Sequence, residues 1–321
     1  MKRVLVSNIM MLKERERFDK QLRDSGYQPV WPKVKQFLTE NDCLKLVGDV
    51  DGWLAGDDQI TRTVLEAASP RLKVISKWGT GVDSIDRTAA EDLEIPVFNS
   101  PGAFSHAVAE VALHYMLSLS RHLVQVDRDI RRGHWPKPLG IELSQSKVGI
   151  VGFGAIGQRI GDLSGSFGAS VYFFDPQKNE EVALTSTVAL PKSLEEIANE
   201  CDFICLACNY TSENHHLINA KFLNEMKSNA YLINVARGQL VDERALEKAI
   251  ASGQIAGAGL DVFETEPLPV DSILRNFDNV ILGSHNANNA LAAVENVHQN
   301  TLRNLDSVLS RKQVKEEVLT L

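Results

Sequence analysis

Three polar side chains suited to proton transfer and anion binding follow strand-like segments in the last third of the chain. Arg237 follows the run YLINVA, Glu266 lies in the loop after AGAGLDV, and His285 follows NVILG. A histidine donates a proton near neutral pH, and a carboxylate on its other ring nitrogen would fix its tautomer and raise its pKa. An arginine binds a carboxylate with paired hydrogen bonds. These types suit reduction of a 2-oxo acid, where hydride transfer leaves an alkoxide that needs a proton.

A glycine-rich loop earlier in the chain is suited to the coenzyme of such a reaction. The stretch KVGIVGFGAIG carries Gly152, Gly154 and Gly157 in the G-x-G-x-x-G spacing, after a predicted strand and before a predicted helix. In this arrangement the backbone at the helix N-terminus, here Ala155 and Ile156, approaches a pyrophosphate closely. We therefore expect a dinucleotide-binding loop at this position.

Asp175 indicates which dinucleotide the loop would bind. It lies about 20 residues past the first glycine, at the end of the next predicted strand, where a carboxylate accepts hydrogen bonds from a ribose. A 2′-phosphate at the same place would be repelled, so we expect NAD rather than NADP. Lys178 follows closely enough to leave NADP as an alternative.

Strands alternate with helices along most of the chain, which predicts parallel sheets covered by helices on both faces. The first unit is predicted to have helices at 11–25 and 60–68 and strands at 2–7, 43–48, 73–76 and 95–98. A long apolar helix is expected at 102–121, and the tail at 290–310 is predicted to be helical. The second unit is predicted to be a doubly wound sheet of six strands, at 148–151, 170–174, 202–207, 231–236, 256–262 and 279–283.

The composition restricts the class of protein. The chain has 321 residues, enough for two domains, and a net charge of −8. Binders of nucleic acid or of anionic membranes are usually basic, so neither partner is expected. No apolar run reaches the roughly 18 residues of a spanning helix, and the N-terminus does not resemble a signal peptide. We therefore expect a cytoplasmic protein with a small-molecule substrate.

Two clusters could hold a metal, and a structural role is the better interpretation of each. Cys201, Cys205 and Cys208 have a C-x3-C-x2-C spacing, but they fall on a predicted buried strand that turns them to opposite faces. His106 and His114, with Glu110 between them, share one face of the apolar helix, which packing and interdomain hydrogen bonds explain. No metal is expected.

The motifs GTGVDSID, SPGAFSHAVAE, VGFGAIG, NVARGQLVDE and GLDVFETEP, with the strand-final His285, resemble those of the D-isomer-specific 2-hydroxyacid dehydrogenases. The resemblance covers about residues 40–310. It implies two doubly wound parallel-sheet domains, with an NAD-binding Rossmann domain at 102–285 inserted into a flavodoxin-like substrate domain at 1–101 and 286–321. Such an insertion would explain why the glycine loop stands in the middle of the chain. The implied reaction is hydride transfer between NAD(H) and a D-2-hydroxy acid or 2-oxo acid.

The resemblance also implies roles for individual residues and an assembly. Arg237, Glu266 and His285 would be catalytic, and backbone amides of the GTGV loop would bind the substrate carboxylate. Family members are commonly homodimers through the inserted domain, and RRGHW at 131–135 falls in that region. The implied substrate loop consists of Gly79, Thr80, Gly81 and Val82, and the implied coenzyme-lining residues are Val108, Cys208, Thr211, Val235, Ala236 and Asp261.

The substrate is less determined than the reaction. Lys77 could bind a second anion of the substrate, such as a phosphate, but Asp57 and Asp58 in the preceding loop would repel one. Ser284 stands where the family usually has proline, and 286–289 where it usually has small residues, so the pocket around His285 departs from the pattern. D-3-phosphoglycerate dehydrogenase is the alternative enzyme, and an NAD(H)-sensing, corepressor-like protein is the alternative of another class.

Overall fold

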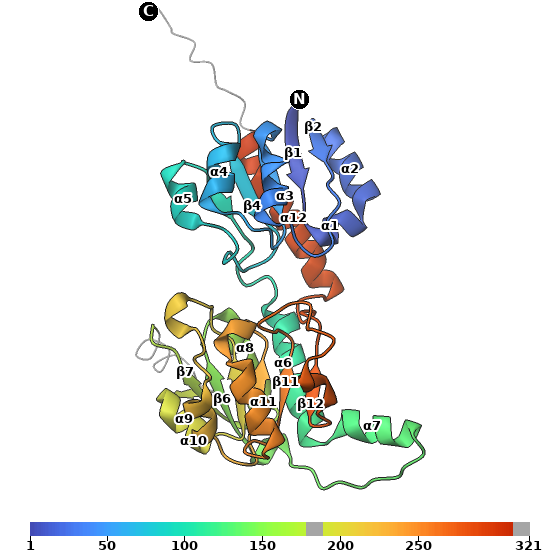
Figure 1. The fold of residues 1–321 in the computed structure, drawn as a ribbon, viewed down its shortest axis with the longest axis vertical. Coiled ribbons are helices and arrows are strands. Elements are labelled where there is room, and N and C mark those ends of the chain that lie inside the picture. Colours follow the sequence, from blue (N-terminus) through green and yellow to red (C-terminus); the bar gives the residue numbers. More distant parts are fainter. Residues whose placement is uncertain (178–188, 311–321) are drawn as a thin grey trace, which may run out of the picture. The chain divides into compact units, whose positions relative to one another are not determined.

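The computed structural model describes residues 1–177 and 189–310, which form two compact α/β units (Figure 1). Unit 1 contains Met1–Ala103 and the chain from Leu291 onward, and unit 2 contains Phe104–Ala290. Each unit is built on one parallel sheet, as the sequence predicted. No helix within the described ranges has both the length and the hydropathy needed to cross a membrane.

Unit 1 has a five-stranded sheet in the order β2-β1-β3-β4-β5, the flavodoxin-like order. Its strands are β1 (Lys2–Val6), β2 (Tyr27–Val30), β3 (Gly52–Ala55), β4 (Val74–Lys77) and β5 (Val97–Phe98). The helices within residues 1–103 are α1 (Ile9–Lys13), α2 (Arg15–Asp24), α3 (Glu40–Leu44), α4 (Arg62–Ala68) and α5 (Arg87–Asp92). Trp53 of β3, with no exposed surface, is the largest side chain of its core.

The strand predicted at 43–48 is wrong. Thr39 accepts a hydrogen bond from the backbone of Asp42 and so starts α3, which contains Cys43, and a 3₁₀ turn follows at Val47–Asp49. Cys43 and Val47 of this segment are buried and Leu44 and Leu46 are partly buried, all of them packed in the core of unit 1. The strand of this region is β3, and β2 was not predicted.

The helix at the end of the described chain belongs to unit 1. This helix, α12 (Leu291–Leu309), packs against β3 and β4, and Figure 1 shows it beside the early strands of the chain. A Cβ on Gly52 would lie 2.7 Å from Leu305, so glycine allows the helix to approach the sheet closely. Ser76 of β4 donates a hydrogen bond to the carbonyl of Thr301 at 2.9 Å. The last described helix of the chain therefore covers one face of the sheet that the first residues form.

Unit 2 has a seven-stranded sheet in the order β12-β11-β10-β9-β6-β7-β8. All six predicted strands are present and one more, β8, extends the sheet. The strands are β6 (Lys147–Val151), β7 (Ser170–Phe174), β8 (Ala189–Pro191), β9 (Phe203–Leu206), β10 (Tyr231–Asn234), β11 (Gly257–Leu260) and β12 (Val280–Leu282). The helices are α6 (Ser105–Ser120), α7 (Leu123–Arg131), α8 (Ala155–Ser166), α9 (Leu194–Glu200), α10 (Ala220–Glu225) and α11 (Glu243–Ala251).

The long apolar helix predicted from the sequence is α6, and it is largely buried. It packs against α8, β10 and β11, with a stripe of exposed polar residues on its remaining side. A helix that is apolar around most of its circumference is typical of such an interior position. It therefore lies against the two strands whose ends carry the candidate site.

Candidate active site

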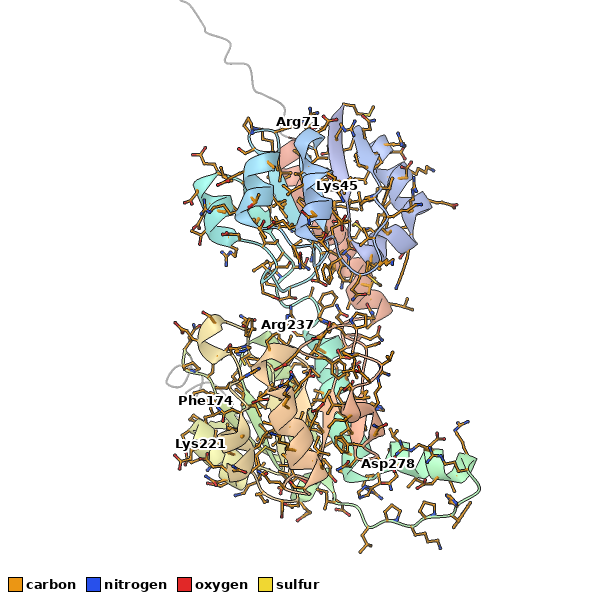
Figure 2. The ribbon with its side chains drawn as sticks, in the orientation of Figure 1. Lys45, Arg71, Phe174, Lys221, Arg237 and Asp278 are labelled. Atoms are coloured by element: carbon orange, nitrogen blue, oxygen red, sulfur yellow. The ribbon has the colours of Figure 1, made fainter. Side chains whose placement is uncertain are left out.

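The candidate site lies at the carboxyl-terminal edge of the sheet in unit 2. Asn234 of β10 pairs with Leu260 of β11, and Leu260 pairs with Leu282 of β12, so the three strands end side by side. The loops that follow carry the four polar residues singled out in the sequence: Arg237 (labelled in Figure 2), Asp261, Glu266 and His285. Ligands of parallel sheets bind at this edge.

Glu266 and His285 form a pair suited to proton transfer. Oε2 of Glu266 lies 2.7 Å from Nδ1 of His285, and Oε1 accepts a hydrogen bond from the backbone of Phe263 at 3.1 Å. The glutamate is thus fixed at both oxygens. Both side chains are partly exposed, 34% for the histidine and 26% for the glutamate. Because Nδ1 is occupied, Nε2 is the ring nitrogen suited to exchange a proton with a ligand.

Asp261 holds the turn that carries His285. Its carbonyl accepts a hydrogen bond from the backbone N–H of His285 at 2.7 Å, and its carboxylate accepts from those of Asn286 at 3.1 Å and Ala287 at 2.9 Å. His285 has φ of 55°, a left-handed conformation that non-glycine residues seldom adopt. The carboxylate of Asp261, 2% exposed, therefore stabilises an unfavourable backbone conformation at the histidine.

Arg237 lies on a turn shaped by Asn234, which sequence reasoning had not singled out. The buried Asn234 side chain accepts from the backbone of Ala236 at 3.1 Å and donates to the carbonyl of Arg237 at 2.9 Å. A Cβ on Gly238 would lie less than 3.0 Å from backbone atoms of Phe263. The turn with Arg237 and the loop leading to Glu266 are therefore in direct backbone contact, which requires glycine at 238.

The glycine loop after β6 leaves an open approach to the start of α8. Gly152 has φ of 91°, and a Cβ there would lie 2.5 Å from the backbone of Cys208. A Cβ on Gly157 would collide with the carbonyl of Gly152, so both glycines allow close packing within the unit. Gly154, the N-cap of α8, has nothing within 4 Å of a Cβ position. Ala155 and Ile156 follow as the first residues of the helix, so space for a phosphate group lies before an N-terminus.

Asp175 connects the end of β7 to the glycine loop. One carboxylate oxygen accepts from the backbone of Phe153 at 2.9 Å and the other from that of Gln177 at 3.0 Å. The carboxylate is partly exposed and stands beside the loop, where a ribose hydroxyl would donate to it. The alternative residue Lys178 lies outside the described part of the chain. The loop and the carboxylate thus fit a dinucleotide.

The remaining coenzyme-lining residues predicted in unit 2 fall on three elements. Val108 is buried on α6, Val235 and Ala236 are buried directly after β10, and Cys208 and Thr211 follow β9. Burial raises the pKa of the Cys208 thiol to about 11, so this thiol remains neutral near pH 7. The amide of Thr211 donates to the side chain of Asn214 at 2.7 Å.

The loop predicted to bind the substrate carboxylate follows β4 in unit 1. Gly79 has φ of 115°, its carbonyl accepts from the backbone of Ser100 at 2.8 Å, and the carbonyl of Thr80 accepts from Asn99 at 2.6 Å. The amides of residues 79–82 donate no hydrogen bond to any part of the chain that the structure describes. Consecutive backbone N–H groups of this kind form an anion-binding concavity.

Lys77 is already paired with a carboxylate. Its Nζ lies 2.9 Å from Oδ1 of Asp57 and donates to the carbonyl of Trp78 at 3.0 Å, and its side chain is 5% exposed. The expectation that both loop carboxylates would face a ligand is wrong for Asp58, which is fully buried. Asp58 accepts hydrogen bonds from Ser7, Leu38 and Gly56, so it shapes the loop from inside the unit.

The two clusters considered as metal ligands have other contacts. Nδ1 of His106 accepts a hydrogen bond from Arg159 at 3.1 Å, and His114 lies 3.5 Å from the hydroxyl of Ser118. The contact of His106 with Arg159 is made within unit 2. The four cysteines of the chain are free thiols. Among the described residues no group of three or more His, Cys, Asp or Glu side chains is arranged to hold a metal ion.

Comparisons with known proteins show which family the chain resembles. Residues 113–287 match the model of the family described as "D-isomer specific 2-hydroxyacid dehydrogenase, NAD binding domain". Over 300 residues the chain is 37% identical to a glyoxylate reductase from Thermofilum pendens, an alignment that covers 90% of this chain and 87% of that protein. Over 256 residues it is 38% identical to a D-3-phosphoglycerate dehydrogenase from Methanocaldococcus jannaschii, covering 79% of this chain and 48% of that protein.

Solved structures show the same fold. A D-lactate dehydrogenase from Aquifex aeolicus, complexed with NAD and lactic acid, matches with a TM-score of 0.83 at 27% sequence identity. The match covers 95% of this chain and 95% of that one.

The close contact at Gly238 gives a direct test of how the site is assembled. Gly238→Ala should destabilise the protein by about 1–3 kcal/mol, because the new methyl group must push apart two backbone segments. Gly48→Ala, where a Cβ meets nothing within 4 Å, is the control and should change the stability by less than about 0.5 kcal/mol. Denaturant unfolding measures both values. Equal stability of the two variants would contradict the contact described here.

Proposed function

The chain belongs to the D-isomer-specific 2-hydroxyacid dehydrogenase family, and from this premise we propose that Arg237, Glu266 and His285 are its catalytic residues. The protein is an NAD-dependent oxidoreductase that transfers a hydride between NAD(H) and a 2-hydroxy acid or 2-oxo acid. The observation that carries the residue assignment is the 2.7 Å contact between Glu266 and His285 at the carboxyl edge of the sheet.

In the direction of reduction, His285 would act as the general acid. Bound NADH supplies the hydride. Nε2 of His285 donates its proton to the oxygen that becomes the hydroxyl, and Glu266 stabilises the imidazolium through Nδ1. Arg237 binds the substrate carboxylate and polarises the carbonyl. In oxidation the same nitrogen takes the proton back.

The coenzyme would be held by unit 2 and the substrate carboxylate by the amide loop at 79–82 in unit 1. Gly152, Gly154 and Gly157, with the backbone of Ala155 and Ile156, would receive the pyrophosphate at the start of α8. Asp175 would bind the adenosine ribose. Further coenzyme contacts are proposed for Val108, Cys208, Thr211, Val235, Ala236 and Asp261.

Asp175 gives the first test of these assignments. The unmodified protein should bind NAD(H) at least roughly tenfold more tightly than NADP(H), because the carboxylate accepts from a ribose hydroxyl and repels a 2′-phosphate. Asp175→Ala should narrow that ratio. Asp162→Ala, an exposed carboxylate on α8, should leave it unchanged. Coenzyme titration followed by fluorescence measures the ratios, and equal affinities in the unmodified protein would contradict the assignment.

The substrate is proposed to be a small 2-oxo acid that carries no second anion. Lys77 is the cation nearest the amide loop in the sequence, and Asp57 already neutralises it at 2.9 Å. A phosphate on the substrate would have to displace this carboxylate and would meet its repulsion. The pairing of Lys77 with Asp57 therefore favours acids without a second anion, such as glyoxylate, over a phosphorylated substrate.

A panel of 2-oxo acids tests both the activity and this selectivity. We expect NADH oxidation with glyoxylate, hydroxypyruvate or pyruvate, and kcat/KM at least about tenfold lower with 3-phosphohydroxypyruvate. Asp57→Asn should raise kcat/KM for the phosphorylated acid, because Lys77 then has no carboxylate partner there. A preference of the unmodified protein for the phosphorylated acid would support D-3-phosphoglycerate dehydrogenase instead. Coenzyme binding without reduction of any acid would support the sensor alternative.

Substitutions of His285 and of Glu266 should change different properties of the reaction, the first its rate and the second its pH dependence. His285→Ala should lower kcat by the roughly 10²–10⁴-fold typical of a lost general acid. Reduction needs the imidazolium, so its rate falls as pH rises, and Glu266→Gln should move that fall to lower pH because the imidazolium loses its carboxylate. Glu264→Gln, which removes a carboxylate paired with His216, is the control and should leave the pH profile in place. An unmoved profile in Glu266→Gln would argue against the pair.

The helix α7 supports a homodimer. None of its residues is buried, and apolar side chains at Leu123, Val124 and Ile130 are 54%, 42% and 41% exposed. The segment after it exposes Trp135 at 78%. Large exposed apolar patches mark interaction sites, and we assign these exposed side chains to a contact with a second copy of the chain. A monomer at micromolar concentration in sedimentation would contradict this assignment.

A cytoplasmic location is proposed from the cysteines. All four are free thiols and three are buried, as is typical of a reducing compartment. We propose no nucleic-acid or membrane partner, because the net charge is −8. Cell fractionation tests the location, and recovery of the protein in a membrane or secreted fraction would contradict it.

A further inference from the structure

Tyr115 contributes a buried hydroxyl to the carboxylate that holds the His285 turn. It lies on α6, its side chain is 4% exposed, and its hydroxyl lies next to the Asp261 carboxylate, to which it can donate a hydrogen bond. Gly283, two residues before His285, gives this contact room. A Cβ at Gly283 would lie less than 3.0 Å from both the Tyr115 hydroxyl and the Asp261 carboxylate. Helix, carboxylate and turn therefore meet at one point within unit 2.

The hydroxyl can act only as the donor in this contact. Burial, together with the charge of Asp261, holds the pKa of Tyr115 well above its usual value, so it keeps its proton. The carboxylate also accepts from the backbone N–H groups of Asn286 and Ala287. Tyr115 thus adds a polar contact to the Asp261 carboxylate from α6, which lies outside the turn.

We propose that Tyr115 is a positioning residue for the reaction: through Asp261 it fixes the left-handed turn at His285 and so the direction of Nε2. This rests on the proposed function of His285. A buried carboxylate that loses a donor shifts to recover one, and such a shift moves the backbone amides it holds. Displacement of a reacting group by about 1 Å can cost around 10²-fold in rate. The effect should therefore fall on the chemical step and not on binding.

Tyr115→Phe removes the hydroxyl and keeps the ring. We expect kcat for 2-oxo acid reduction to fall about tenfold, while KM and the NADH dissociation constant stay within about twofold. The primary isotope effect with deuterated NADH should rise as the chemical step becomes slower. The matched control is Tyr231→Phe, another buried tyrosine of unit 2, which stacks on Phe203 and should keep the parent kcat.

Gly283→Ala tests the contact between Tyr115 and Asp261 with a substitution at a third residue. The new methyl group would lie less than 3.0 Å from both the Tyr115 hydroxyl and Oδ1 of Asp261, so it must displace at least one of them and should produce a similar fall in kcat. This variant keeps the proposal testable if Tyr115→Phe fails to fold. Thermal unfolding of every variant shows whether a loss of rate merely follows a loss of folded protein.

The decisive measurement is a double-mutant cycle. If Tyr115 acts through His285, then Tyr115→Phe in the His285→Ala background should change the residual kcat by less than about twofold. An equal tenfold loss in that background would overturn the proposal, as would a parent-like kcat in Tyr115→Phe. A different result would show that the proposed role of His285 is wrong. In that case His285→Ala would retain its activity with either tyrosine or phenylalanine at position 115.

Discussion

The parallel register of β10, β11 and β12 is the constraint on which the candidate site depends. Because Asn234, Leu260 and Leu282 stand in line across these strands, three loops begin at the same edge with no further requirement on the chain. Each loop then needs only a local contact to orient its polar residue. These contacts are made by the side-chain amide of Asn234, by Gly238 through its close approach to another loop, and by the carboxylate of Asp261. A shift of register by one residue would separate them all.

Both units use a buried carboxylate for the same purpose. In unit 1, Asp58 accepts from a serine and two backbone amides, and in unit 2, Asp261 accepts from two backbone amides and lies next to the hydroxyl of a tyrosine. Burying such a group is favourable only when its oxygens are satisfied, so each carboxylate strongly favours one loop conformation. Loops at the ligand-binding edge of a sheet are thereby ordered before any ligand binds. That order is what a site for precise hydride and proton transfer requires.

The sequence predicted well what depends on short motifs and poorly what depends on tertiary contacts. The glycine loop and six strands of unit 2 follow from patterns a few residues long. The segment 43–48 reads as a strand because its apolar residues suit one, yet Thr39 starts a helix there. The contact between Tyr115 and Asp261 could not be predicted from the sequence. A tyrosine within an apolar helix carries no sequence pattern that indicates which residue its hydroxyl will meet. Asp57 and Asp58 are neighbours in the sequence. Only the folded structure shows that Asp58 is buried in the core and that Asp57 is exposed.

The discontinuity of unit 1 has a consequence for how the protein is made. The face of its sheet around Gly52 is covered by Leu305 and Leu309, which are synthesised after all of unit 2. On the ribosome, unit 2 can close its core while the older strands of unit 1 still expose apolar surface. Domains that emerge complete fold as they appear, whereas this one must wait until α12 has been synthesised. The nascent chain therefore leaves one face of its first sheet uncovered until Leu305 and Leu309 have been made.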